Sequence, residues 1–341
     1  MKMAKKIEKI LDKDYIQKIF KKKVDFYFPR LKSKKISDIE IERVSPVWAK
    51  KTCLARYKII FSNSSKKIIR ASAKTDGSKK RTFKIMKYLY ENGFDRGKFQ
   101  IRKPLDYIDE VGALFYEEAN GLPLSLILER GKFSFEIFKD IAELLFKIHS
   151  LNGKIKRKAI IVDLTHYKKI FRKIRKLMPS ISNYVISEKE IEFINELKND
   201  WGFIHGDFYP GNILINKNRI IAIDFDKAGR GPKLLDAAAF YASLEFPKSL
   251  WPLNLSQKER KLAQDNFLRR YCQFNNLNLQ KTKAKLNNFL IKIFLDAIYF
   301  SGILLFDGWK EIDEKVKRDF SNKIKDLFLK VREYLPYVKK Y

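Results

Sequence analysis

The chain has 341 residues, 45% of them hydrophobic, and its 72 Lys and Arg against 40 Asp and Glu give a formal net charge of +32. This length is sufficient for two lobes with separate cores, and the hydrophobic content argues against disorder over most of the chain. With only two cysteines and three histidines, the sequence suggests neither a disulfide framework nor a metal site built from histidine and cysteine.

The net charge favours anionic partners such as nucleotides, nucleic acid or a membrane surface. A solvated, lysine-rich surface is the simpler interpretation of the same number. The N-terminus, MKMAKKIEKILDKDYIQ, carries charges throughout and has no apolar run of signal-peptide length. We therefore expect a protein that is not secreted and that works in the cytoplasm.

The first predicted element is a basic amphipathic helix over residues 4–24, in which apolar residues recur at helical spacing among lysines. Such a helix can bind a membrane or nucleic acid, but an apolar stripe more often packs on its own domain. Residues 36–74 then read as strands, in the runs ISDIEIERV, CLARYKIIF and KKIIRASAK, and predict an antiparallel sheet.

A helix is expected next, in SKKRTFKIMKYLYENGF, because apolar residues share one face and Asn92-Gly93 is a typical helix stop. Two further strand candidates follow at 99–102 and 112–116, and the sequence EEANGLP after them breaks the pattern. We place the boundary here, with an N-terminal lobe at residues 1–118 and a C-terminal lobe at residues 119–341.

The C-terminal lobe is predicted to be mainly helical, with helices near 135–151, 167–177, 188–197, 258–274, 283–306 and 314–335. Residues 289–306 approach the length of a membrane span. Lys292 and Asp296 lie inside this run four residues apart, where they can pair along one helix face. Because charge is costly in lipid, a buried core helix is favoured over a span.

The stretch IHGDFYPGNILINKNRIIAIDFD, from Ile204 to Asp226, has the residues that suggest chemistry. Two short β-prone runs flank a polar turn and predict a hairpin inside the helical lobe. Asn212 and Asp224 would then be cross-strand neighbours, and two oxygen-bearing side chains at that spacing can share a hard cation. Asp207, on the incoming loop, is close enough along the chain to face the same space.

These motifs resemble the aminoglycoside phosphotransferase and choline kinase group of the protein-kinase-like fold. The resemblance is carried by H-G-D-x4-N at 205–212, I-D-F-D at 223–226 and the D-x-A element at Asp236, in this order and spacing. It implies an α+β, two-lobed fold, with a small antiparallel sheet and one main helix in the N-terminal lobe. The catalytic hairpin would lie in the larger helical lobe.

The resemblance also implies roles for these residues. Asp207 would act as the catalytic base toward an accepting hydroxyl, and Asn212 and Asp224 would hold Mg²⁺ shared with ATP. His205 and Asp236 would support the catalytic loop without touching substrate. The structural alternatives are a turn residue for Asn212 and a cap for Asp207.

The nucleotide-binding part matches the family less closely. Lys74 is the first choice for the phosphate-binding lysine of the third strand, and Arg70, on the same strand face, competes with it. The acidic partner expected in the next helix is missing near Arg81-Thr82, and the covering loop at 45–51 contains no glycine. The segment from Glu117 to Ala119, which includes the candidates Glu118 and Ala119, resembles the hinge that meets adenine through main-chain groups, and an inter-lobe linker is the alternative.

Two hypotheses follow. The first is an ATP-dependent kinase that phosphorylates the alcohol group of a small molecule, since Gly206 and the short interval before Asp236 argue against a regulated protein kinase. The positive charge disfavours polycationic acceptors. The second is a weakly catalytic or non-catalytic protein of the same fold that binds nucleic acid or an anionic membrane through its basic helices. The intact trio of Asp207, Asn212 and Asp224 favours the first, and no obligate protein partner is evident.

Overall fold

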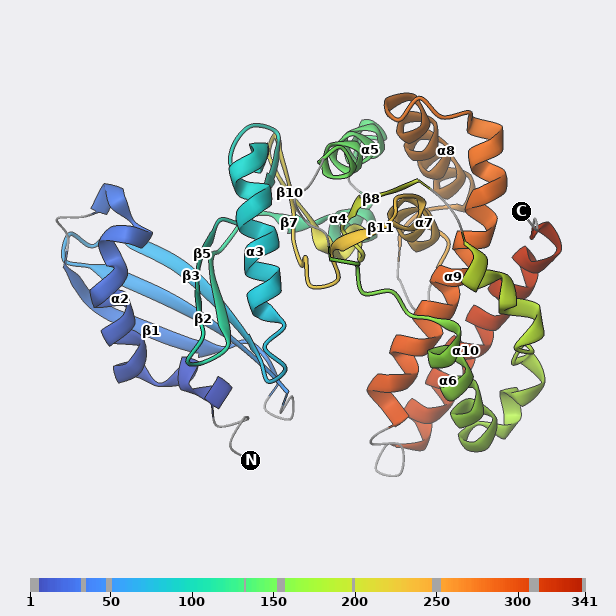
Figure 1. Cartoon of the computed structure of the whole chain (residues 1–341), viewed down its shortest axis with the longest axis horizontal. Helices are drawn as coiled ribbons and strands as arrows, with labels where there is room; N and C mark the ends of the chain where they lie inside the picture. The colour runs from blue at the N-terminus through green and yellow to red at the C-terminus, as the bar shows by residue number, and fades with distance from the viewer. Residues whose placement is uncertain are drawn as a thin grey trace. The chain divides into compact units, whose positions relative to one another are not determined.

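The computed structural model describes residues 6–31, 35–46, 51–131, 133–151, 157–197, 200–246, 253–306 and 313–338. The chain forms two compact units, one made of Met1–Gly121 with Leu214–Asp226 and the other of Leu122–Ile213 with Lys227–Tyr341. The first unit holds the main sheet and the second holds most of the helices (Figure 1).

The first unit is built on a five-stranded sheet in the order β1-β2-β3-β6-β5. All neighbouring strands in it are antiparallel. The strands are β1 (Ile36–Arg43), β2 (Thr52–Phe61), β3 (Lys66–Lys74), β5 (Pro104–Ile108) and β6 (Ala113–Glu117). In β2 every second residue from Cys53 to Phe61 is buried, as expected for a strand with one face against a core.

Helix α2 (Lys13–Tyr27) supplies the other side of that core (Figure 1). Its Phe20 ring meets Tyr57 of β2 and Phe115 of β6 edge-on, at centroid distances of 5.3 and 6.0 Å. Asp12 caps the helix by accepting from the Tyr15 N–H, and it separates α2 from the short 3₁₀ helix η1 (Lys9–Leu11). The lysines of α2 therefore lie on the outer face of a helix that packs on its own unit.

Helix α3 (Lys79–Leu89) follows β3 and packs against β5 and β6. It continues into a π-helical turn, η3 (Tyr90–Phe94), where Gly93 has a positive φ of 98°. Beyond it, β4 (Phe99–Ile101) pairs in parallel with β10 (Arg219–Ala222), and β9 (Ile213–Asn216) lies beside β10. The pairing of β10 with β4 ties the hairpin of residues 213–222 to the first unit.

The second unit contains α4 (Leu124–Arg130), α5 (Glu136–His149), α6 (Leu164–Leu177), α7 (Leu234–Ser243), α8 (Gln257–Phe274), α9 (Leu279–Phe306) and α10 (Glu314–Tyr334). Strands β8 (Trp201–Ile204) and β11 (Gly229–Pro232) form an antiparallel pair, and β7 (Leu122–Pro123) is two residues long. Short 3₁₀ helices complete it at η4 (Pro179–Tyr184), η5 (Lys189–Glu196), η6 (Pro210–Asn212) and η8 (Leu335–Tyr337); another, η2 (Pro29–Leu31), follows α2 in the first unit.

Helix α9 is long and apolar enough to cross a bilayer by length and composition, and within the described ranges it alone passes that test. However, 56% of its apolar window is buried inside the protein. The Lys292 ammonium is buried and donates to both Asp296 oxygens at 3.0 Å and to the Val162 carbonyl at 3.0 Å. The predicted pairing of Lys292 with Asp296 is thus confirmed, in a helix packed against α6, α7 and α10.

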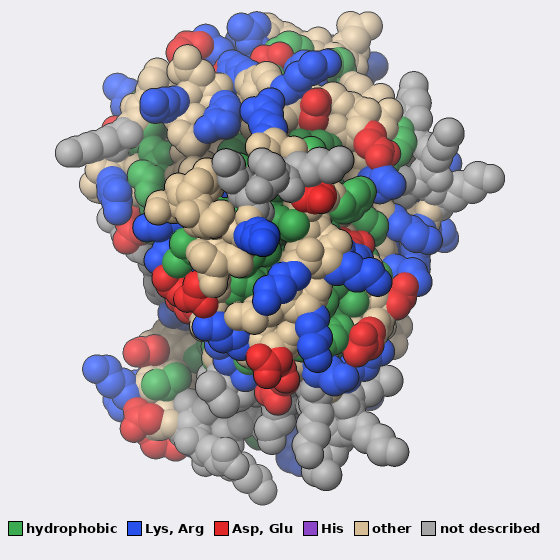
Figure 2. Space-filling model, turned by 90° about the vertical axis from the view of Figure 1, so that its left-hand side faces the viewer, with side chains coloured by type: hydrophobic (Ala, Val, Ile, Leu, Met, Phe, Trp, Pro, Cys, Tyr) green, Lys and Arg blue, Asp and Glu red, His purple; other side chains and the backbone are tan. Residues whose placement is uncertain are grey.

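Charge on the outer surface is mixed where Figure 2 shows it. Lys and Arg side chains are spread over that face, and Asp and Glu side chains lie among them. Several of the lysines in the first unit are ion-paired, for example Lys58 with Glu40 at 2.7 Å and Lys13 with Asp38 at 2.9 Å. Part of the lysine content of this unit is therefore engaged in local ion pairs.

The α+β architecture and the antiparallel sheet predicted from the sequence are confirmed. The predicted helix over residues 4–24 is interrupted at Asp12, where a side-chain cap starts a new helix. Strand β5 was missed because it begins with proline, and residues 189–196 form 3₁₀ rather than α-helix. The hairpin, assigned to the C-terminal lobe by its place in the sequence, groups with the first unit through β4.

Phe20→Ala tests the core beneath α2. The truncation should lower the free energy of unfolding by about 3–5 kcal/mol, because a fully buried ring loses its contacts with Tyr57 and Phe115 and leaves a cavity. Denaturant unfolding followed by circular dichroism measures the change. Phe26→Ala, on the same helix with 73% of the residue exposed, is the matched control and should have little effect. Equal losses in the two variants would contradict the packing.

Candidate active site

The loop that follows β8 holds the residues with predicted catalytic roles. It runs from His205 to Asn212 and ends in the short helix η6. Gly206 has a positive φ of 79°, and a Cβ at this position would lie 2.7 Å from the backbone oxygen of Lys227. Only glycine fits both the backbone conformation and the close approach of the neighbouring chain.

Asp236, in the first turn of α7, holds this loop. Its carboxylate accepts hydrogen bonds from the backbone N–H of His205 at 2.7 Å and of Gly206 at 2.8 Å. The same carboxylate lies 3.0 Å from Nε2 of His149 on α5, and both side chains are 1% exposed. A buried carboxylate with three such partners is fully satisfied, so it acts as a fixed anchor for the loop.

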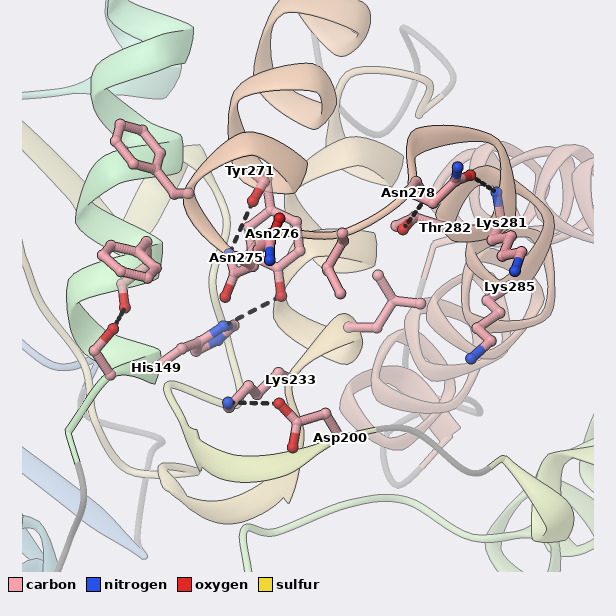
Figure 3. Close-up of a pocket in the computed structure, with 15 residues that line it drawn as sticks. His149, Asp200, Lys233, Tyr271, Asn275, Asn276, Asn278, Lys281, Thr282 and Lys285 are labelled. Atoms are coloured by element: carbon pink, nitrogen blue, oxygen red, sulfur yellow. Dashed lines mark hydrogen bonds and ion pairs between the residues drawn. The ribbon is translucent and has the colours of Figure 1, made fainter.

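The contacts of His149 extend to α8. Its Nδ1 lies 3.4 Å from the Tyr271 hydroxyl, at the wall of a cavity of about 460 Å³ (Figure 3). In the same view Lys233 is paired with Asp200 at 2.6 Å. Asp236 is therefore held from α5 by His149, which in turn contacts Tyr271 of α8.

Asp207 projects from the anchored loop with 31% of its side chain exposed. One of its carboxylate oxygens accepts from Nζ of Lys227 at 2.9 Å. The amide nitrogen of Asn212 donates to the backbone carbonyl of Asp207 at 3.0 Å. These contacts fix the position of the carboxylate and leave it accessible to a ligand.

Asp224 follows β10, in the first unit. It is exposed and has a positive φ of 63°, a conformation that aspartate tolerates better than most residues. Among the described residues no three His, Cys, Asp or Glu side chains converge as a metal cluster. A magnesium ion shared with nucleotide phosphates needs only one or two protein carboxylates, so this observation does not bear on such a site.

Asp226 is the centre of a charged cluster within the first unit. It accepts from Nζ of Lys74 on β3 at 2.7 Å, from Nζ of Lys79 on α3 at 2.7 Å and from the Thr82 hydroxyl at 2.9 Å. Burial by itself would raise the pKa of Asp226, but the charges and hydrogen bonds of the two lysines lower it to about 2. The Lys74 ammonium thus has a fixed anionic partner.

Arg70, the second candidate on β3, is engaged elsewhere. Its Nε lies 2.6 Å from an oxygen of Glu118, which also pairs with Arg56 of β2 at 3.1 Å. Burial by itself would raise the pKa of Glu118, but the hydrogen bonds from Arg56 and Arg70 hold that pKa below its ordinary value. The Glu118 N–H donates to the Ile68 carbonyl at 3.1 Å, which extends the pairing of β3 and β6 by one residue.

Part of the glycine-free covering loop lies outside the described residues, since positions 47–50 are not among them. Of the loop, Ser45 and Lys51 are described at its two ends. The Ser45 hydroxyl oxygen accepts from the Leu54 N–H at 3.1 Å, which joins the start of the loop to β2.

A cavity of about 480 Å³ lies beside Asp207 within the second unit. Residues of the loop at 205–212 form one wall, and side chains of α7 and α9 form much of the remainder. Lys227 lies at this wall, with its ammonium 4.0 Å from the centre of the Phe300 ring. A ligand in the cavity can reach the Asp207 carboxylate.

A family model for the phosphotransferase enzyme family matches residues 67–274, which is more than half of the chain. The chain belongs to the phosphotransferase enzyme family. A search among curated proteins found no match.

Solved structures with the same fold cover almost the whole of this phosphotransferase. An ethanolamine kinase of Plasmodium vivax is 17% identical, with a TM-score of 0.60 over 95% of this chain and 89% of that one. A choline kinase of Cryptosporidium parvum is 14% identical, with a TM-score of 0.61 over 94% of each chain. An amicoumacin kinase in complex with AMP-PNP and Ca²⁺ is 16% identical, with a TM-score of 0.54 over 93% of each chain.

Sequence reasoning missed several residues that the structure brings to these sites in the phosphotransferase. Asp226 belongs to the I-D-F-D motif, and its two-residue spacing from Asp224 is the one sequence signal that could have pointed to it. Lys79 is 7% exposed, and a lysine in the first turn of a helix gives no sequence signal of burial. Lys227 and His149 lie far in sequence from their partners on other elements, and no local pattern pairs them.

Gly206→Ala tests the close approach of Lys227 to the loop at 205–212. Alanine should cost about 1–2 kcal/mol for the left-handed backbone and more for the contact with Lys227, since the clash is with backbone. Thermal unfolding measures the loss. Gly97→Ala is the matched control, because Gly97 also has a positive φ, of 81°, but no other atom lies within 4 Å of the place that the alanine methyl group would take. A smaller loss at Gly206 than at Gly97 would contradict this geometry.

Proposed function

We propose that this member of the family is an ATP-dependent phosphotransferase that moves the γ-phosphoryl group to a hydroxyl of a small molecule. The observation that carries the proposal is the setting of Asp207. Its carboxylate is positioned by Lys227 and Asn212, on a loop held by Asp236, and it borders a cavity of ligand size within one unit. The fold of the ethanolamine, choline and amicoumacin kinases supports the same class of reaction.

Asp207 is the proposed catalytic base. The acceptor hydroxyl would donate its hydrogen bond to Asp207, which orients the oxygen for attack on the γ-phosphorus. As the new phosphorus–oxygen bond forms, the bond to the bridging oxygen of ADP breaks and the hydroxyl proton passes to the carboxylate. Lys227, paired with one oxygen of Asp207, keeps the carboxylate in place.

Asn212 and Asp224 are the proposed magnesium ligands. Asn212 uses its amide N–H on the Asp207 carbonyl, so its amide oxygen is the atom available for a cation. Asp224 offers an exposed carboxylate after β10. Both supply oxygen, the ligand atom that Mg²⁺ prefers, and the bound ion would neutralise charge on the nucleotide phosphates.

Lys74 is the proposed phosphate-binding residue, and Asp226 is its positioning residue. Helix α3 lacks the acidic residue that would pair with this lysine. In this proposal Asp226, which follows β10, takes its place and pairs with Lys74. Lys79 and Thr82 of α3 bind the same carboxylate, so α3 still helps to place the lysine. Arg70 is assigned to Glu118 instead, and Ala119 remains the proposed main-chain contact for adenine.

The alternative, a binding protein that uses its basic helices, is less well supported. Helix α2 buries Ile16, Phe20 and Tyr27 in its own unit, and α6 buries Tyr167, Phe171 and Ile174. The apolar faces of both helices are therefore used for folding. Salt-dependent binding of RNA or anionic vesicles would be the observation in its favour.

Asp207→Ala should lower the rate of phosphoryl transfer by about 10²–10⁴-fold, because the general base is lost. Asp224→Ala should abolish Mg²⁺-dependent turnover in the same assay of nucleoside diphosphate release. Asp95→Ala, an exposed acidic residue in the turn after η3, serves as the control and should retain activity. Turnover that survives Asp224→Ala in a clean preparation would contradict the proposal.

Asp226→Asn should raise the KM for ATP roughly tenfold or more, since Lys74 and Lys79 lose the charge that positions them, and tenfold corresponds to about 1.4 kcal/mol. Asp226→Glu should restore part of the affinity. Asp109→Asn is the control. It removes the exposed carboxylate that pairs with Lys80, another lysine of α3, and should leave the KM for ATP unchanged. If Asp226→Asn lowers stability but not ATP affinity, Asp226 has only a structural role.

A further inference from the structure

We infer that the acceptor is an uncharged alcohol with an apolar body, bound in the cavity beside Asp207. This inference rests on the proposed function, because it identifies the occupant of the cavity with the molecule that is phosphorylated. It follows from three features of the second unit, which are the position of the cavity, the chemistry of its walls and the state of its charged groups.

The position restricts the occupant to the acceptor side of the reaction. Gly206, Asp207 and Tyr209 of the catalytic loop all line the cavity. A molecule seated there can place a hydroxyl within hydrogen-bond reach of the Asp207 carboxylate, which is the geometry a general base requires. The volume of about 480 Å³ is in the usual range of small-molecule sites.

The walls away from Asp207 are mainly aliphatic and aromatic. Side chains from the segment before α6, from α7 and the residues that follow it, and from α9 provide them, including Ile160, Val162, Leu235, Phe246, Ile293 and Phe300. Ile160 is 51% exposed and Phe300 is 36% exposed, so apolar surface continues from the cavity to solvent. An apolar body gains free energy by covering these groups, whereas a sugar with many hydroxyls would leave its polar groups without partners there.

Among the described residues that line the cavity, each carboxylate already has its partners. Asp296 accepts from both the Lys292 ammonium and the Tyr167 hydroxyl, and Asp236 is held by His149 and two backbone N–H groups. Asp207 is paired with Lys227. A cationic amine would compete with these internal cations for a carboxylate, and its desolvation would be poorly repaid.

An anionic body is disfavoured for the same reason. Lys227 is the lysine that lines the described part of the cavity, and its ammonium is shared between Asp207 and the face of the Phe300 ring. Recruiting it to a carboxylate or phosphate of the acceptor would release the catalytic carboxylate. The charge pattern thus selects an acceptor without a charged group.

The test compares three acceptors of matched length, 1-hexanol, 6-amino-1-hexanol and 6-hydroxyhexanoate, with the full-length protein, ATP and Mg²⁺. Binding is measured by ligand-observed NMR and transfer by mass spectrometry of the phosphate ester. Hexanol should bind and react at least tenfold better than either charged analogue. Lengthening the alcohol chain from hexanol to octanol should tighten binding by about fourfold for each added methylene group that the apolar walls cover.

Ile160→Asp should weaken hexanol binding at least tenfold and improve binding of the amino alcohol, because it places a new carboxylate at an exposed position of the cavity wall. Leu262→Asp, at an exposed leucine of α8 that does not line the cavity, is the matched control and should change neither.

Decanol supplied in solution or in phosphatidylcholine vesicles separates two sources of the acceptor. Turnover in vesicles alone indicates a membrane alcohol, turnover in both indicates a soluble one, and either supports the class.

Tighter binding of the amino alcohol or the hydroxy acid, or no binding of any uncharged alcohol, would overturn the inference. The proposed function fails separately, if ATP with Mg²⁺ does not bind, or if transfer to whichever acceptor reacts is unaffected by Asp207→Ala. Asp207-dependent transfer to the amino alcohol would leave the phosphotransferase intact and reject only the uncharged, apolar acceptor.

Discussion

The hydrogen bonds to Asp236 are the interaction on which the candidate active site depends. A carboxylate with 1% of its side chain exposed would be costly to bury alone, yet here two backbone N–H groups and His149 satisfy it. The backbone donors belong to His205 and Gly206, so the same bonds that make the burial tolerable fix the loop that carries Asp207. Gly206 permits this arrangement because its positive φ and missing Cβ let the loop pass Lys227 closely.

The first unit uses charge in a comparable way. Asp226 joins β3 to α3 through Lys74, Lys79 and Thr82, and Glu118 joins β2 to β3 through Arg56 and Arg70. In a chain with a net charge of +32, these two carboxylates hold four of its basic groups in fixed positions. Placing Arg70 with Glu118 and Lys74 with Asp226 distinguishes two residues that strand alternation alone puts on the same face.

Much of the fold could be predicted from the sequence because strong periodicity coincides with burial. The strands at 36–43, 52–61 and 66–74 match their apolar alternation, and α8, α9 and α10 end within a few residues of their predicted bounds. Polar contacts between distant elements could not be predicted in this way. Asp226 with Lys79, and His149 with Asp236, depend on tertiary packing, and the membership of the hairpin in the first unit depends on its pairing with β4.

The most direct test of the account follows phosphoryl transfer itself. Phosphorus NMR of the protein with ATP, Mg²⁺ and an uncharged alcohol should show a new phosphate monoester that accumulates in step with ADP. Asp207→Asn, which keeps the shape of the side chain but removes the base, should bind ATP and form no detectable ester on the same timescale. Ester formation at an equal rate by Asp207→Asn would contradict the central claim that this carboxylate activates the accepting hydroxyl.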